Sequence, residues 1–410
     1  MVFTRCMRRT HPGAIGGRVV PGAEGERMSK GTSGEYWAAP ALPSVFKHTL
    51  LSRYIPRFGG MTGSKSGGEV VYLDGYAGEG RYENGTAGSA ELVLKIAADH
   101  QAKNLVRWTC FFAERSAPSF SHLESVVAEY RGQGVDARAF HGDVTGLLDE
   151  VLAAAVGRPL FLFLDPCGLA LPFDTLVDVL ARRRKEIWPP TELLLNFSMM
   201  AVRRIGGNSH SAKGNERTNE RLDEVCGGRW WRDFFADGYT GDADDKVAAE
   251  YSRLLGERTG MSTVSVPVTN APNRKAVYNL VFGTRSNHGL WAFGDAHARA
   301  RDTWWEGLEL TEEAEDNALF SVATLQRPDP DHVRARAVPA MAANLAELLR
   351  AGHPFKLVDH TLQVFGEHYG QVPETVARQA VKHLHGAGGT PSDGKGSPVH
   401  KLEVRPPVRP

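Results

Sequence analysis

Residues 70–82 read VVYLDGYAGEGRY, and this segment constrains the fold more than any other. An apolar run ends at Asp74, and Gly75, Gly78 and Gly80 follow it. The pattern predicts a buried strand that leads into a tight loop, because glycine has no side chain to block a ligand and adopts positive φ. An acid at the strand tip beside such a loop suits S-adenosylmethionine, whose ammonium group needs a carboxylate, better than it suits a dinucleotide.

Three later apolar segments also end in an acidic residue, and these residues are Glu114, Asp143 and Asp165. Parallel strands place their carboxyl ends at one edge of a sheet, where ligands of α/β proteins bind. We therefore expect an α/β fold with a Rossmann-like sheet and helices on both faces. At its edge, Glu114 would accept hydrogen bonds from ribose hydroxyls and Asp143 would bind an adenine amino group. The cofactor loop would consist of Asp74, Gly75, Ala77, Gly78 and Gly80.

Two alternatives share this architecture. A plain βα turn would explain one glycine loop, but four acids in chain order at successive strand ends disfavour chance. A nicotinamide dehydrogenase would carry the spacing G-x-G-x-x-G, which differs from the spacing of Gly75, Gly78 and Gly80.

The composition agrees with an enzyme that lies free in the cytoplasm. The chain has 48 Lys and Arg against 48 Asp and Glu, so no global charge attracts it to nucleic acid or membrane. No run of 18 apolar residues predicts a membrane span. The four cysteines are scattered, which predicts reduced thiols and no metal site.

The chain divides into parts of different composition. Residues 1–40 are rich in Gly, Arg and Pro and are expected to be disordered, with Met28 as an alternative start. Residues 44–300 form the predicted catalytic domain, in which Ser44 caps the first helix. Further helices are expected at 89–99, 119–131, 145–156 and 173–184, and further strands at 192–197 and 276–284.

Residues 206–246 are polar and rich in glycine, and they form an expected insertion over the sheet edge. An aromatic cluster within them admits two interpretations, a lid over the substrate or a surface helix with aromatic anchors, of which we favour the second. The cluster consists of Trp230, Trp231, Phe234 and Phe235.

Residues 330–405 have a different pattern from the rest. Three helical segments are expected at 339–351, 357–368 and 374–386, and a small β-wing within 390–404. Three short helices and a wing predict a winged-helix-like domain. Its third helix carries few positive charges. Binding to a protein, or packing on the core, is therefore at least as plausible for this domain as binding to nucleic acid.

These motifs resemble the three-Cys-motif partner protein family, TcmP, over most of residues 44–300. The resemblance implies a class I S-adenosylmethionine-dependent methyltransferase fold and a radical-SAM-like three-Cys-motif protein, of a type found in phages, as the partner. Two positions depart from the family pattern, Ala90 and Cys167. The resemblance rests on Lys47, His48, the 74–80 loop, Gly88, Ser89, Glu114, Asp165 to Gly168, Asn196, Phe197, Arg203 and Arg204.

The loop is also distantly similar to that of bacterial 23S rRNA adenine-N6 methyltransferases, which carry D-P-P-[YF] at the fourth strand. By that similarity, Asp165 and the Pro166 carbonyl would accept hydrogen bonds from a target amino group. Gly168 cannot stack on a base, so an aromatic residue elsewhere would have to do so. The candidates are Tyr76, Tyr82, Phe197 and the aromatic residues within 230–235. Cys167 suggests the nucleophile of a cytosine-C5 methyltransferase, although we favour a small buried apolar residue at this position.

Four polar residues outside the loop are candidates to bind substrate. Lys47 precedes the first strand, Asn196 lies in the fifth, and Arg203 and Arg204 follow it. The arginines suit a phosphate or carboxylate, although solvated surface charges are as plausible.

Three functions remain in competition. The chain is an active methyltransferase on nucleic acid or a nucleotide-like substrate, a non-catalytic partner or scaffold protein of the same fold, or a winged-helix nucleic-acid-binding regulator. The acids at all four strand tips favour the first.

Overall fold

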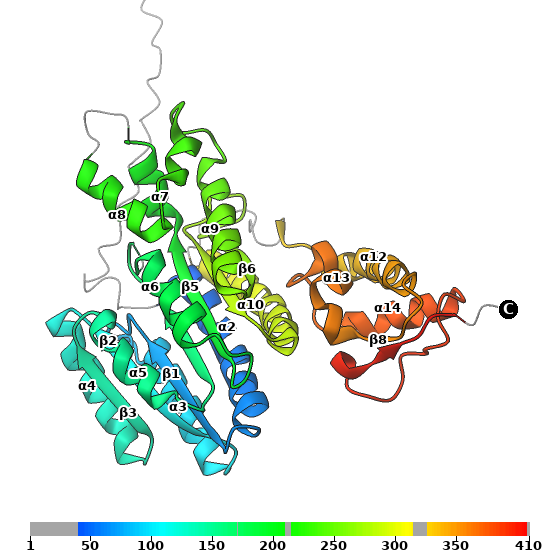
Figure 1. Cartoon of the computed structure of the whole chain (residues 1–410), viewed down its shortest axis with the longest axis horizontal. Coiled ribbons are helices and arrows are strands. Elements are labelled where there is room, and N and C mark those ends of the chain that lie inside the picture. Colours follow the sequence, from blue (N-terminus) through cyan, green and yellow to red (C-terminus); the bar gives the residue numbers. More distant parts are fainter. Residues whose placement is uncertain (1–39, 170, 210–214, 315–325, 408–410) are drawn as a thin grey trace, which may run out of the picture.

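The structure is a computed structural model that describes residues 40–169, 171–209, 215–314 and 326–407. An α/β domain holds one seven-stranded sheet, and a smaller helical unit follows it in the sequence (Figure 1). The segment 1–40, apart from its last residue, falls outside the described residues, so the prediction of disorder there stays a prediction. Within the described part of the chain, every helix is too short or too polar to cross a lipid bilayer.

The sheet has the strand order β3-β2-β1-β4-β5-β7-β6. The first five strands are parallel, and β7 lies antiparallel between β5 and β6. The strand order reverses between β1 and β4, which is the place where open α/β sheets bind their ligands. The strands are β1 (Glu69–Asp74), β2 (Arg107–Glu114), β3 (Asp136–His141), β4 (Leu160–Leu164), β5 (Thr191–Ser198), β6 (Ser262–Val268) and β7 (Tyr278–Thr284).

Helices cover both faces of the sheet, because alternate side chains of each buried strand point to opposite sides. Val71 and Leu73 of β1 pack into one core with α5 to α9, whereas Val70 and Tyr72 pack into the other with α2, α3, α4 and α10. The helices are α2 (Leu42–Phe58), α3 (Ser89–Ala102), α4 (Ala117–Gly132), α5 (Leu148–Ala154), α6 (Phe173–Val177), α7 (Met199–Gly206), α8 (Glu216–Cys226), α9 (Ala243–Thr259) and α10 (Asn287–Ala314).

The expected mostly parallel sheet with helices on both faces is confirmed, and local details differ. Ser44 is not the cap of α2, because the helix begins at Leu42 and Ala41 precedes it. The helix expected at 173–184 changes to a π-helical turn after Val177. Strand β6 was not expected from the sequence.

The aromatic residues of the expected insertion anchor it to the core. Trp231 and Phe235 are fully buried among α7, α8 and α9. Their burial leaves them unable to form a lid over a substrate.

The C-terminal unit has a core of its own, built on α12 (Pro330–Leu349), α13 (Thr361–Phe365) and α14 (Thr375–Gly386). The β-wing expected within 390–404 is wrong in detail, because only β9 (Glu403–Val404) is a strand and it pairs with β8 (Phe355–Lys356). A winged-helix domain is therefore not confirmed.

The C-terminal unit is attached to α10 of the α/β domain. Tyr369 donates a hydrogen bond to the Leu290 carbonyl at 2.5 Å, and the Glu374 amide donates one to Asp295 at 3.0 Å. Trp291 of α10 also lies in the core of the C-terminal unit, so the two parts share buried surface.

A buried carboxyl ties α2 to the centre of the sheet. Glu192 of β5 is 1% exposed and accepts hydrogen bonds from Tyr54 of α2 and from Thr284 of β7, the latter at 2.8 Å. Burial raises the pKa of Glu192 to about 7, although the hydrogen bonds from Tyr54 and Thr284 oppose this increase. The hydroxyl groups therefore offset part of the cost of placing this carboxyl in the core.

We expect Tyr54→Phe to lower the free energy of unfolding by about 1–3 kcal/mol, because it removes one hydrogen bond from a buried carboxyl. Tyr251→Phe is the matched control. Tyr251 is equally buried, but its hydroxyl has no hydrogen-bond partner among the described residues, so its loss should not destabilise the protein. Urea denaturation of both variants measures the difference, and equal effects would contradict the assigned role of Tyr54.

Candidate functional site

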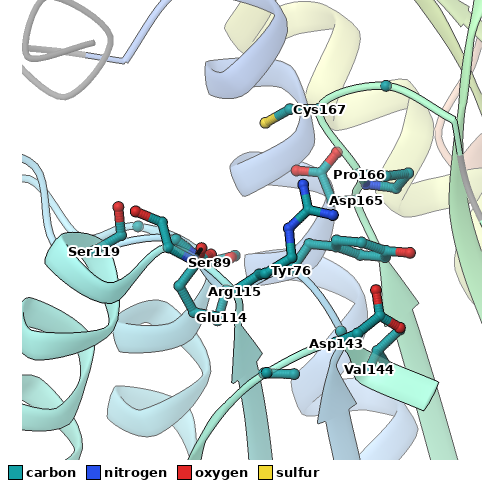
Figure 2. Close-up of a pocket in the computed structure, with 18 of the residues that line it drawn as sticks. Tyr76, Ser89, Glu114, Arg115, Ser119, Asp143, Val144, Asp165, Pro166 and Cys167 are labelled. Atoms are coloured by element: carbon teal, nitrogen blue, oxygen red, sulfur yellow. Dashed lines mark hydrogen bonds between the residues drawn. The ribbon is translucent and has the colours of Figure 1, made fainter. Parts of the chain in front are cut away.

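A cavity of about 500 Å³ opens at the carboxyl ends of β1, β2, β3 and β4. Three of the four predicted acids line it, and Figure 2 shows Glu114, Asp143 and Asp165 around the same space. The loop after β1 contributes Gly75, Tyr76, Ala77 and Gly78, α2 contributes Lys47 and His48, and the loop after β4 contributes Pro166, Cys167, Gly168 and Leu169.

The glycine loop is held by the neighbouring strands. The Gly75 amide donates a hydrogen bond to Phe163 of β4, and the Ala77 amide donates one to Ala113 of β2, both at 2.9 Å. Gly75 also has no room for a side chain, because a Cβ there would lie 2.7 Å from Leu164. The loop backbone therefore forms one wall of the cavity, as the sequence predicted.

Gly78 and Gly80 both have positive φ, 61° and 79°, which explains why glycine stands at both positions. Gly80 does not line the cavity. Its carbonyl accepts a hydrogen bond from the Gly88 amide at 2.9 Å, so its role is to turn the chain toward α3.

Glu114 uses both carboxylate oxygens to fix the backbone beside the cavity. One oxygen accepts a hydrogen bond from the Gly78 amide at 3.0 Å, and the other accepts one from the Ser116 amide at 2.6 Å. Each oxygen can accept a second hydrogen bond. Glu114 therefore joins the glycine loop to the start of α4 and remains able to bind hydroxyls.

Asp74 lies beneath the loop and does not line the cavity. Its side chain is fully buried and accepts hydrogen bonds from Ser89 at 2.7 Å and from the Tyr76 amide at 3.1 Å. Burial raises the pKa of Asp74 to about 7, although these two hydrogen bonds lower it. The structure thus makes Asp74 a support of the loop, whereas the sequence predicted a direct contact to an ammonium group.

Asp143 lines the cavity and is exposed. Its carboxylate caps the turn Val144–Gly146 by accepting hydrogen bonds from the amide and the hydroxyl of Thr145, at 3.0 and 2.8 Å. The buried Val144 lines the cavity beside it. An apolar side chain next to a carboxylate is the kind of surface that a flat heterocycle with an amino group requires.

The opposite wall is an ion pair between α2 and the tip of β4. Lys47 is 4% exposed and pairs with Asp165, whose other oxygen accepts a hydrogen bond from the Asn196 amide group at 2.7 Å. The Lys47 ammonium also lies 5.8 Å from the centre of the Tyr278 ring. These contacts fix the direction of the Asp165 carboxylate at the cavity.

His48 stands beside this ion pair as a neutral imidazole. Desolvation by burial, together with the positive charge of Lys47, lowers the pKa of His48 to about 3, and Asp165 opposes the shift. The ring packs edge to face against Tyr82 at 5.9 Å between centroids. At neutral pH, Lys47 is thus the cation on this side of the cavity.

Cys167 is exposed, so the expectation of a buried apolar residue at this position is wrong. Desolvation at the cavity wall and the negative charge of Asp165 raise the pKa of the Cys167 thiol. A thiol that stays protonated is a poor nucleophile, and this disfavours addition of Cys167 to a pyrimidine ring.

Arg203 and Arg204 do not line the cavity. Arg203 donates hydrogen bonds to the buried carboxylate of Asp244 and to the Ala276 carbonyl, both at 2.8 Å, and Arg204 is exposed. The structure therefore brings Lys47 to the cavity and Asn196 into contact with Asp165, and it gives Arg203 a structural ion pair.

Two arginines that the sequence analysis did not single out line the cavity, Arg115 after β2 and Arg221 of α8. Arg115 directly follows the predicted strand that ends at Glu114, and this position could have predicted that it lines the cavity. Arg221 reaches the cavity from the insertion, more than fifty residues beyond β4, so no local pattern indicated it.

Comparison with known proteins gives distant likeness alone. No protein-family model matches the chain, and no curated protein matches it. Among solved structures, the methyltransferase domain of bacterial CtHen1-CN is 12% identical over 56% of this chain and 97% of that chain, with a TM-score of 0.28. The methyltransferase domain of bacterial CtHen1-C is 10% identical over 57% and 97%, also with a TM-score of 0.28. This overlap is too low to support any conclusion on cofactor or substrate.

We expect Asp74→Asn to change how stability depends on pH. Folding raises the pKa of Asp74 from 3.8 to about 7, so its stabilising contribution is complete below pH 3.8 and is lost as the pH rises toward 7. The loss amounts to about 4 kcal/mol at most. Asparagine has no such proton to lose, so the variant should gain stability relative to wild type across this window.

Urea denaturation at a series of pH values measures this gain. Asp136→Asn, at the exposed start of β3, is the control and should run parallel to wild type. A constant difference between Asp74→Asn and wild type would contradict a buried, protonated Asp74.

Proposed function

We propose that this chain is an S-adenosylmethionine-dependent methyltransferase that acts on a nitrogen atom of a nucleic acid or nucleotide-like substrate. One observation supports this above all others. At the tip of β4, Lys47 and Asn196 hold the Asp165 carboxylate at a cavity whose other wall is a glycine loop fixed by Glu114. A carboxylate in that position suits a target amino group.

The residues of the cavity fit this cofactor. The backbone of Gly75 to Gly78 allows close approach, Glu114 has lone pairs for ribose hydroxyls, and Val144 with Asp143 suits an adenine ring and its amino group. When bound, S-adenosylmethionine supplies an electrophilic methyl group. The buried Asp74 would support the loop from below.

Asp165 is the proposed orienting group. It would accept a hydrogen bond from the target N–H, and so direct the nitrogen lone pair toward the cofactor loop. Lys47 and Asn196 prevent rotation of the carboxylate, which contributes orientation before the reaction begins. The carbonyl of Pro166 lies in the same loop and would accept a second N–H, as in the D-P-P-[YF] motif.

His48 does not suit the role of general base. Efficient proton transfer needs a pKa near the working pH, and the pKa of His48 is about 3. The proton that leaves the methylated nitrogen would therefore pass to water. His48 and Lys47 instead shape the wall that faces the target.

The burial of the candidate aromatic residues bears on which of them could stack on a target ring. Phe197, Trp231 and Phe235 are buried in the core. Tyr76 and Tyr82 line the cavity, and Tyr76 is partly exposed. We propose Tyr76 as the stacking residue, in the role that Gly168 cannot perform.

We also propose that the chain works with a radical-SAM-like three-Cys-motif protein, and this rests on the TcmP resemblance alone. The alternative of a winged-helix regulator is less well supported. Arg378, a basic residue of α14, donates hydrogen bonds to the Gly394 and Ser397 carbonyls, so the face expected to contact nucleic acid is partly used within the unit. A non-catalytic scaffold of the same fold remains the main alternative.

We expect the protein to bind S-adenosylmethionine and S-adenosylhomocysteine with micromolar affinity, and not NAD. Glu114→Gln should weaken binding of S-adenosylmethionine about tenfold or more. Glu114 accepts hydrogen bonds from two backbone N–H groups, and the NH₂ group of glutamine would face one of them as a second donor. Glu124→Gln, an exposed change of the same kind on α4, should bind as wild type does. Isothermal titration measures all three proteins, and absence of binding by wild type would favour a scaffold.

We expect Asp165 to be needed for transfer and not for cofactor binding. Asp165→Asn alone would leave the buried Lys47 without its carboxylate, at a cost of about 3–5 kcal/mol in stability. The double variant Lys47→Met with Asp165→Asn removes both charges and should fold. It should bind S-adenosylmethionine within about twofold of wild type and transfer tritiated methyl groups to pooled RNA and DNA at least a hundredfold more slowly. Transfer at the wild-type rate would remove Asp165 from the mechanism.

A further inference from the structure

A second cavity, of about 380 Å³, lies between the α/β domain and the C-terminal unit. Aromatic rings from α2, α10 and the segment before α14 line it together with one imidazole and one guanidinium. These aromatic and basic side chains belong to Phe46, His297, Arg301, Trp304, Trp305 and Tyr369.

The rings of this cavity are fixed in place. The Trp304 indole N–H donates a hydrogen bond to the Thr269 carbonyl at 3.1 Å, and the Tyr369 hydroxyl donates one to the Leu290 carbonyl at 2.5 Å. Trp305 packs edge to face on Trp304, with 4.9 Å between ring centroids, and remains partly exposed. Rigid aromatic surfaces of this kind bind flat rings by stacking.

Arg301 gives the cavity a positive charge. Within the described part of the chain, its guanidinium makes no hydrogen bond and no ion pair, and no carboxylate lines the cavity. Desolvation by burial lowers the pKa of Arg301, with the exposed Asp302 opposing the shift. A partly buried guanidinium without a hydrogen-bond partner among the described residues is costly, and an anion would relieve that cost.

His297 does not supply a second charge. Burial and the nearby Arg301 lower its pKa to about 3, so the ring is neutral at physiological pH. Its Nδ1 atom faces the backbone at Gly370, where a Cβ would lie 1.9 Å away. The cavity thus combines flat apolar surfaces with one guanidinium, the chemistry that a base and its phosphate require.

The two cavities are neighbours along one edge of the sheet. Phe46 lines the second cavity, while the next two residues of α2, Lys47 and His48, line the first. Val268, at the carboxyl end of β6, lines the second cavity and pairs with Tyr278, whose ring lies under the Lys47 ammonium. Both cavities therefore lie against the same turn of α2, at the edge where the parallel strands end.

We propose that the second cavity binds a nucleotide of a single-stranded nucleic acid, its base on Trp305 and its phosphate on Arg301, while another nucleotide of the same strand occupies the first cavity. This inference rests on the proposed function and specifies its substrate class. The second site would position the strand and would take no part in the chemical step.

The test uses the full chain and fluorescein-labelled single-stranded DNA and RNA ten-mers, with binding measured by fluorescence anisotropy. We expect Arg301→Met and Trp305→Leu each to weaken binding about tenfold. Arg258→Met is the matched control, because Arg258 is exposed at the end of α9, lines neither cavity and forms no ion pair within the described part of the chain. It should change the affinity by less than twofold. Unfolding midpoints equal to wild type confirm that each variant is folded.

Equal affinity of Arg301→Met and wild type for the ten-mers would overturn the proposal. Adenosine monophosphate and inorganic phosphate serve as competitors. They show whether the cavity binds a nucleotide or only a phosphate group. The mononucleotide could bind in an Arg301-dependent way while the ten-mers do not bind. That result would retain a nucleotide site in the second cavity and would overturn the proposal that a nucleic-acid strand binds there.

Titration of the same proteins with S-adenosylmethionine separates this proposal from the proposed function. A protein that binds S-adenosylmethionine but no ten-mer would overturn the second site alone. A protein that binds ten-mers through Arg301 but no S-adenosylmethionine would overturn the transfer function and retain the nucleotide site.

Discussion

The ion pair between Lys47 and Asp165 is the contact on which the arrangement of the site depends. It joins α2, which precedes the sheet in the sequence, to the tip of β4 across 118 positions of the chain. A lysine that is 4% exposed stays charged in a core only with a partner of opposite charge. The pair therefore fixes the start of α2 against the sheet edge, and α2 in turn separates the two cavities.

The other acids of the strand tips act mainly on the protein's own backbone. Asp74, Glu114 and Asp143 each accept a hydrogen bond from at least one backbone amide of the loop that follows or adjoins them. Tight loops expose amides that need acceptors, and carboxylates are strong ones. The carboxylates at the strand tips thus hold the loops around the first cavity in place through contacts within the chain itself.

The sequence was sufficient for features that depend on local pattern. Continuous apolar runs identified the parallel strands, and the acids after them identified the sheet edge, because burial and chain direction decide both. Contacts between side chains far apart in the sequence could not be predicted from it. Arg203 was expected at the substrate, but its partner Asp244 lies 41 residues away on α9. Strand β6 was missed because its exposed edge and Pro267 weaken the strand pattern.

The C-terminal unit contributes to the sheet edge by a loop and not by its helices. In α14, Arg378 and His385 contact carbonyls of the unit's own tail, which limits their use for a partner. The loop before α14 instead reaches α10, and Gly370 permits this with a φ of 69° and no side chain against His297. Tyr369 is thereby placed as a wall of the second cavity. The unit thus completes the wall of the second cavity, and it shares a core with α10 through Trp291.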